Sequence, residues 1–132
     1  MRLTLPHPSM FLIATAILFS APQVSRAQED ATRLRNPATV RADIGGEAHH
    51  SYVIRARKGQ TMTVRISWRQ EGDNNAGFTI TKSPDFSGEQ VDFGSASDDG
   101  KRWSGKIPTT GNYYIYVTGH PIAHYTLRVR LK

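Results

Sequence analysis

Histidines are the residues of this sequence with the most evident capacity for chemistry. His49 and His50 are adjacent, whereas His120 and His124 flank a loop that contains Pro121. Imidazoles bind metals and transfer protons near neutral pH. Adjacent side chains on a strand point to opposite faces, so the first pair cannot easily share a metal, and the second pair lacks the third protein ligand of a zinc site. We therefore expect surface positions and no metal.

A second candidate for chemistry is Asp98-Asp99-Gly100, where two carboxylates precede a glycine. The segment lacks the alternating oxygen ligands of an EF-hand calcium loop, and Asp-Gly between two strands predicts a type I′ hairpin turn. The sequence contains no Gly-x-Ser-x-Gly nucleophile motif and no glycine-rich phosphate loop. These observations predict a non-enzymatic protein with no catalytic residue and no cofactor.

The strongest pattern is a set of arginines that alternate with apolar residues. The set comprises Arg55, Arg57, Arg65, Arg69, Arg128 and Arg130. Tyr114 and Tyr116 alternate in the same way with Ile115 and Val117, and we expect both tyrosines to point outward. Guanidinium groups bind carboxylates and phosphates in bidentate fashion and stack on aromatic rings. The pattern predicts either a face that binds an anionic polymer or a solvated face that arginines keep soluble.

Period-2 alternation predicts that these residues lie on strands of an all-β domain. The clearest strand places Met62, Val64, Ile66 and Trp68 on one face. The other expected strands are centred on 39–44, 52–56, 78–80, 91–93, 103–107, 113–117 and 125–131. Short strands separated by glycine turns favour an antiparallel β-sandwich of about eight strands. Trp68 and Trp103 are in phase with the apolar positions, so we expect both to be core anchors.

The first 27 residues have the layout of a secretory signal peptide. Arg2 precedes the apolar run from Met10 to Phe19, and Ser25-Arg26-Ala27 supplies small residues for a cleavage site. The run is too short to span a bilayer, which takes about 20 apolar residues. We expect residues 1–27 to be removed, residues 28–36 to form a flexible arm and residues 37–132 to form one domain. No membrane span is expected after removal of the signal.

Removal of the signal takes away two positive charges. Without Arg2 and Arg26 the formal net charge falls from +6 to +4. The sequence contains no cysteine, so the domain has no disulfide even though a periplasmic or secreted location is predicted. Export argues against nucleic acid as the anionic partner and leaves an envelope polymer, either peptidoglycan or lipopolysaccharide. The sequence does not define an oligomeric state.

Two stretches of the sequence resemble the bacterial pre-peptidase C-terminal domain family. They are Tyr52-x-Ile-x-Ala-Arg-Lys-Gly-Gln-Thr-Met-Thr-Val-x-Ile66, and Ile107-Pro-Thr-Thr-Gly-Asn-Tyr-Tyr-Ile-x-Val117 followed by Tyr125-Thr-Leu-x-Val129. As a free-standing domain behind a signal, the chain is also similar to the periplasmic inhibitors of g-type lysozyme, over about residues 40–132. The resemblance implies a β-sandwich of jelly-roll type.

The same resemblance implies a protein that inserts a loop into a lysozyme cleft and offers a hydrogen-bond donor to a catalytic carboxylate. The candidate donors are Arg102, His120 and His124, on loops of a rigid scaffold. The alternative is a module that binds an envelope polymer through Arg65, Arg128, Arg130, Tyr114 and Tyr116. A net charge of +4 opposes docking on a basic lysozyme, and an acidic target would remove this objection.

Overall fold

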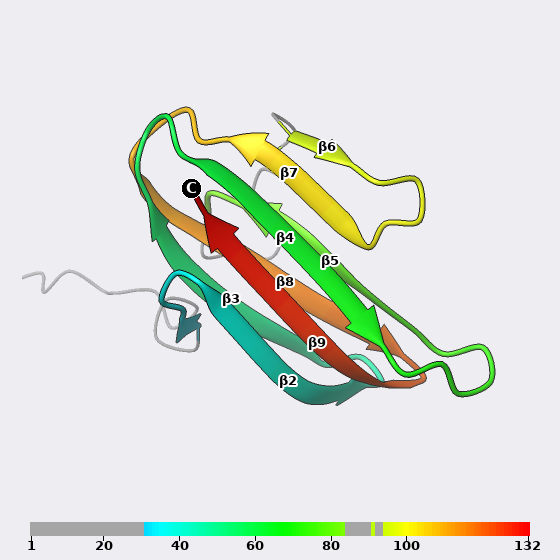
Figure 1. The fold of residues 1–132 in the computed structure, drawn as a ribbon. Coiled ribbons are helices and arrows are strands. Elements are labelled where there is room, and N and C mark those ends of the chain that lie inside the picture. The colour runs from blue at the N-terminus through cyan, green and yellow to red at the C-terminus, as the bar shows by residue number, and fades with distance from the viewer. Residues whose placement is uncertain (1–30, 84–90, 92–93) are drawn as a thin grey trace, which may run out of the picture.

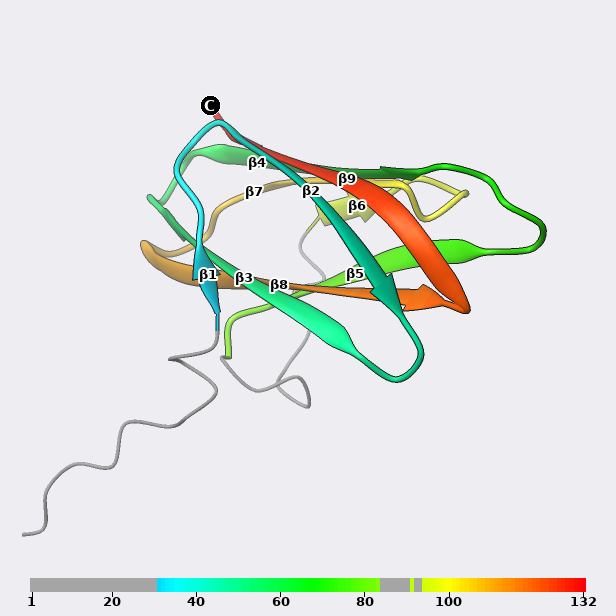
Figure 2. The same ribbon diagram turned by 90° about the horizontal axis from the view of Figure 1, so that it is seen from below.

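The computed structural model describes residues 31–83, 91 and 94–132. These residues form nine β-strands in two sheets that pack face to face (Figures 1 and 2). Among the described residues we find no helix that could cross a membrane. The predicted signal peptide lies outside the described residues, as does Phe93 of the expected strand at 91–93.

The sheets contain four and five strands. The four-stranded sheet has the order β1 (Thr32–Arg33), β3 (His49–Ala56), β8 (Gly111–His120) and β5 (Asn75–Thr81). The five-stranded sheet has the order β2 (Ala38–Gly45), β9 (Ile122–Leu131), β4 (Thr61–Trp68), β7 (Arg102–Lys106) and β6 (Gly94–Ala96). Apart from the β6–β7 hairpin, consecutive strands from β2 onward alternate between the sheets. This arrangement confirms the predicted sandwich of jelly-roll type.

Apolar side chains at alternate positions of the strands fill the space between the sheets. Met62 and Val64 of β4 and Leu127 of β9 are buried on one side, and Ile54 and Ile115 are buried on the other. Removing apolar surface from water contributes about 25 cal/mol per Å². Since no disulfide is present, this core is the main source of stability.

The two tryptophans occupy different environments. Trp103 is 6% exposed and belongs to the core, as predicted. Its indole covers Gly94 and Gly105, where an added Cβ would lie 2.2 Å and 2.8 Å from indole atoms. Trp68, at the end of β4, is only half-buried, and the Lys101 Nζ lies 4.7 Å from its ring centroid. Trp103 is therefore a core residue, as predicted, whereas Trp68 packs against the core from the end of β4 and stays partly exposed.

The described part of the expected N-terminal arm lies against the sandwich. Thr32 and Arg33 pair in parallel with β3, and the Leu34 side chain is buried. The Asn36 amide donates to the Leu131 carbonyl at 2.9 Å and accepts from the Leu131 N–H at 2.8 Å. Leu34 is a single apolar residue among polar neighbours and gives no alternation, so the sequence pattern could not predict strand β1.

The hairpin at Asp98-Asp99-Gly100 is present, but its turn type differs from the prediction. A type I′ turn needs positive φ at both central residues, whereas only Gly100 has it, at 69°. The Gly100 N–H donates to the Ser97 carbonyl at 2.9 Å, so Asp98 and Asp99 are the central residues and the glycine follows them. Hydrogen bonds to Asp99 from the Ser97 hydroxyl and the Lys101 N–H lower the pKa of the Asp99 carboxyl.

Candidate functional site

The adjacent histidines point to opposite faces of β3, as predicted. The His49 ring meets Tyr116 edge to face, with 5.9 Å between centroids. On the other side, His50 Nδ1 lies 2.7 Å from the Tyr125 hydroxyl, which also hydrogen-bonds with the Tyr52 hydroxyl at 2.5 Å. Burial raises the pKa of Tyr125. The hydrogen bonds of His50 and Tyr52 with Tyr125 connect the two sheets, whereas the exposed His49 contacts Tyr116 of its own sheet.

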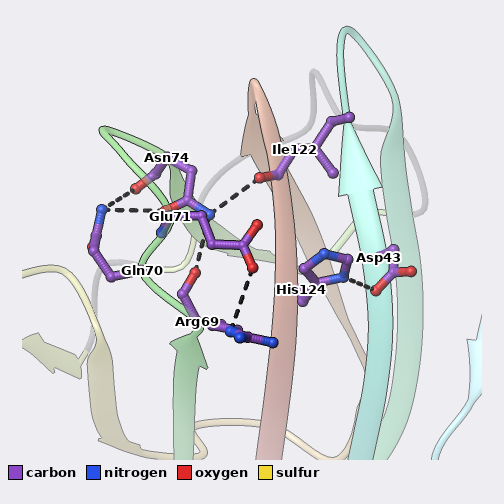
Figure 3. Close-up of polar contacts among 7 residues, drawn as sticks. All are labelled: Asp43, Arg69, Gln70, Glu71, Asn74, Ile122 and His124. Carbon is purple, nitrogen blue, oxygen red and sulfur yellow. Dashed lines mark hydrogen bonds and ion pairs between the residues drawn. The ribbon is translucent and has the colours of Figure 1, made fainter.

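Three chain reversals meet at one end of the sandwich, which we call the hairpin end (Figure 3). They are the β8–β9 turn at Pro121, the β2–β3 turn that begins at Gly46, and the β4–β5 loop at 69–74. The Gly46 N–H donates to the Pro121 carbonyl at 2.9 Å. A Cβ at Gly45 would lie 2.5 Å from that carbonyl and 2.7 Å from Ile122 Cγ1. The β8–β9 turn therefore packs directly on the glycine backbone of β2.

Asn74 fastens the β4–β5 loop to the β8–β9 hairpin. Its side chain is buried and donates from Nδ2 to the carbonyls of Arg69 at 3.0 Å and Ile122 at 3.2 Å. Its Oδ1 accepts from the Glu71 N–H at 2.9 Å and from Gln70 Nε2 at 3.2 Å. Every polar group of this amide has a partner, so the hairpin end is held rigidly without a disulfide.

Ile122 is the one large hydrophobic side chain that the described residues leave exposed, at 60%. It borders a hollow of about 510 Å³ whose walls also include Ile44, Gly45 and Pro121. A single exposed aliphatic side chain is common on protein surfaces, but this one borders a hollow with largely apolar walls, which makes it a candidate contact for another protein. The sequence carried one signal for Ile122, because the alternation of β9 extended back from Tyr125 puts Ile122 on the outward side of the strand with His124.

Acidic groups surround Ile122. Asp43, Glu47, Glu71 and Asp73 are all exposed on the segments that form the hairpin end. Arg69 pairs with Glu71 at 3.4 Å, and His124 Nδ1 donates to Asp43 Oδ1 at 2.5 Å. The local charge is thus negative although the whole chain is basic. His120 and His124, two of the predicted donors, lie here, with His120 exposed at the end of β8.

Replacing Asp43 with asparagine should lower the pKa of His124. The hydrogen bond from His124 to Asp43, and then the charge of Asp43, raise this pKa above 6.5. Because the folded-state pKa is the higher one, the pair stabilises the fold below about pH 6.5 and ceases to do so as the pH rises through the folded-state value. NMR titration of the imidazole measures the shift. Asp73→Asn, which removes a carboxylate that does not contact His124, is the control; an unchanged His124 pKa in Asp43→Asn would contradict the pairing.

The outer face of the five-stranded sheet carries a second concentration of charge. Arg65 of β4 is paired in register with Arg128 of β9 on one side and with Arg102 of β7 on the other. Strands lie about 4.8 Å apart, so the Cα atoms of this arginine row span about 10 Å. The row, with Arg130 and Lys132, lines a groove of about 420 Å³. Arg102, predicted as a donor to lysozyme, therefore belongs to this groove.

The six alternating arginines do not share one face. Arg65, Arg128 and Arg130 lie on the five-stranded sheet, whereas Arg55 lies on β3 of the other sheet. Arg57 is the residue directly after the end of β3, just before the turn that begins at Lys58. Alternation gives the side of a strand and not the sheet to which the strand belongs, so the sequence left open whether these arginines share a face, and the structure places them on different sheets.

Tyr114 and Tyr116 are buried, so the prediction that they form an exposed aromatic face is wrong. Both lie on the side of β8 that faces away from the main core, as alternation indicates, but they are only 4% and 2% exposed. They pack with Val53 and Ala31 in a second apolar cluster. The Tyr116 hydroxyl donates to the Ser83 carbonyl at 3.4 Å. Neighbouring segments cover this face and remove both rings from any polymer site.

Within the described ranges, no group of three or more His, Asp or Glu side chains could hold a metal ion. His120 and His124 are not joined by a third ligand there. Their environment instead contains an exposed aliphatic side chain and carboxylates, which suit contact with another protein.

No protein family model matches this sequence, and no curated protein matches it. Solved structures do match, and they show the fold, a β-sandwich like that of a pre-peptidase C-terminal domain. The example from the Bacillus anthracis collagenase has a TM-score of 0.56 and 19% identity, covering 76% of this chain and 94% of that one.

Two periplasmic lysozyme inhibitors match as well. PliG of Aeromonas hydrophila, a periplasmic inhibitor of g-type lysozyme, has a TM-score of 0.63 and 23% identity, covering 77% of this chain and 96% of its own. PliG of Salmonella Typhimurium has a TM-score of 0.53 and 21% identity, covering 78% and 99%. The neighbours include the two kinds of protein that the sequence resembles, and at these identities they show the fold.

Proposed function

We propose that this chain is an exported, non-catalytic inhibitor of a g-type lysozyme and acts in the periplasm. The observation that carries the proposal is the exposed Ile122 on a rigid β8–β9 turn, in a sandwich whose structural neighbours are inhibitors of this enzyme class. A turn that is ordered before binding loses little entropy on docking.

In this proposal the β8–β9 turn enters the lysozyme cleft. Ile122 fills an apolar part of the cleft, and His120, on the other side of Pro121, donates a hydrogen bond to a catalytic carboxylate. His124 supports the turn through Asp43. The exposed carboxylates of the hairpin end complement a basic target, which removes the objection that a net charge of +4 would repel it.

The test is an activity titration. Purified residues 28–132 are added to a g-type lysozyme acting on cell walls, and the residual rate is measured against the molar ratio. The proposal predicts loss of activity near one inhibitor per enzyme. Full lysozyme activity at a large molar excess of the protein would overturn it, and a c-type lysozyme in parallel measures the selectivity.

A further inference from the structure

The arginine row carries a repulsion that the described part of the chain does not neutralise. Like charges directly opposite each other on neighbouring strands destabilise a sheet. Within the described ranges, no carboxylate forms an ion pair with Arg65, Arg102 or Arg128. Asp99 lines the adjoining hollow, where its one carboxylate faces the basic side chains of Lys101 and of the three arginines of the row. A bound anion would remove this repulsion.

We propose that this groove is a second binding site, separate from the hairpin end, for a sugar that carries several phosphate groups. The row presents three guanidinium groups from adjacent strands, and the positive charge is extended by Arg130 of β9 and by Lys132, which follows that strand. Guanidinium groups bind phosphate oxygens in bidentate fashion. Several phosphates on one ring match charges that are rooted within about 10 Å of one another.

The chemistry of the groove favours phosphate over carboxylate. A carboxylate has two oxygens, and one bidentate guanidinium engages both of them. A phosphate has three terminal oxygens and nearly twice the charge, so it can bridge two neighbouring arginines. Thr61 and Thr63, the remaining lining residues, place hydroxyl groups beside the arginines, and the Thr63 hydroxyl also lies 3.3 Å from the Ser104 hydroxyl.

The groove also lacks the means to bind an uncharged glycan. Its walls contain only arginine, lysine and threonine side chains, with no aromatic ring on which a sugar could stack. This composition disfavours peptidoglycan strands and favours the phosphorylated sugars of lipopolysaccharide, the anionic envelope polymer that carries phosphate on sugar.

The test measures binding of inositol hexakisphosphate, a ring with six phosphates, by isothermal titration calorimetry. Glucose 6-phosphate and polygalacturonate are titrated in parallel as a single phosphate and a carboxylate polymer. Arg65→Gln with Arg128→Gln removes two members of the row. Arg55→Gln with Arg57→Gln is the matched control, because it removes the same charge from exposed positions outside the groove.

We expect the row variant to lose about tenfold or more in affinity for inositol hexakisphosphate and the control to stay within about twofold. Removing the repulsion should leave the melting temperature of the row variant unchanged or higher, which shows that it folds. Equal losses of affinity in both variants would show that binding depends only on the net charge of the protein, and this would overturn the proposed site. Binding of polygalacturonate as tight as that of inositol hexakisphosphate, or no binding of the latter, would overturn the preference for clustered phosphate.

Discussion

Replacing Trp103 with alanine should destabilise the folded protein by about 3–5 kcal/mol. The indole is buried in the core and covers the paired backbones of Gly94 and Gly105 at the β6–β7 edge of the sandwich. Its removal leaves a cavity and two adjacent glycines without side-chain cover. Since small domains are stable by only about 5–15 kcal/mol, the melting temperature should fall by about 10 °C or more. Urea and thermal unfolding of the mature chain measure both quantities.

Two further variants test whether Trp103 has this role. Trp68→Ala removes the same side chain from a half-buried position, so we expect it to cost about half as much as Trp103→Ala. Gly94→Ala adds a methyl where the indole already lies and should cost about 1–3 kcal/mol. A loss for Trp103→Ala no larger than that for Trp68→Ala would contradict the position of Trp103 in the core.

The fold was predictable because strands with one buried and one exposed side have sequences in which apolar and polar residues alternate. Residues 62–68 alternate apolar and polar, and the structure buries Met62, Val64 and Ile66 as this pattern indicates. What alternation cannot supply is the partner of each strand. The register that joins Arg65 to Arg102 and Arg128 depends on β4 lying between β7 and β9, and no local pattern encodes that order.

The errors of the sequence analysis have a common physical origin. Alternation reports which side of a strand a residue occupies, but burial also depends on what covers that side. Tyr114 and Tyr116 point away from the main core and are still buried, because Ala31 and Val53 pack with them. Ile122 lies on the outward side of β9, as alternation in that strand indicates, and it stays 60% exposed because no described segment covers it. What covers each side therefore determines both outcomes.

For the candidate site, the sequence could predict which loops take part, but not the residues that hold them together. His120 and His124 were identified from their residue type, and both lie at the hairpin end. Asn74 and Asp43, which hold that end, were not, because an amide in a polar loop and a carboxylate on a strand are common in any sequence. Their roles follow from partners 48 and 81 positions away in the chain.

Charge is distributed unevenly over the molecule, and this separates the two proposed functions. The hairpin end carries exposed carboxylates around Ile122, whereas the arginine row lies about four residues further along β9 from His124, or about 13 Å. A basic protein surface is attracted to the first region and a phosphorylated glycan to the second. Substitutions in one region should leave the function of the other intact.

Replacing Ile122 with aspartate should abolish inhibition of g-type lysozyme while leaving the fold unchanged. The side chain is 60% exposed, so its replacement removes little core packing. In the proposed complex, however, it is the apolar anchor, and such anchors contribute about 2 kcal/mol or more when truncated. Ile122→Ala should therefore weaken inhibition about thirtyfold. Ile122→Asp should weaken it further, because docking would bury an unpaired carboxylate.

Lysozyme titrations with each variant measure these effects, and thermal melts confirm folding. The Arg65→Gln, Arg128→Gln double variant is the control for specificity, since it removes positive charge from the distant groove. It should inhibit the lysozyme as well as the unmodified protein does. If Ile122→Asp inhibits normally while the arginine variant does not, the enzyme contacts the arginine row instead of the hairpin end. That outcome would transfer the inhibitory surface to the five-stranded sheet, where the groove could not serve a glycan and an enzyme at the same time.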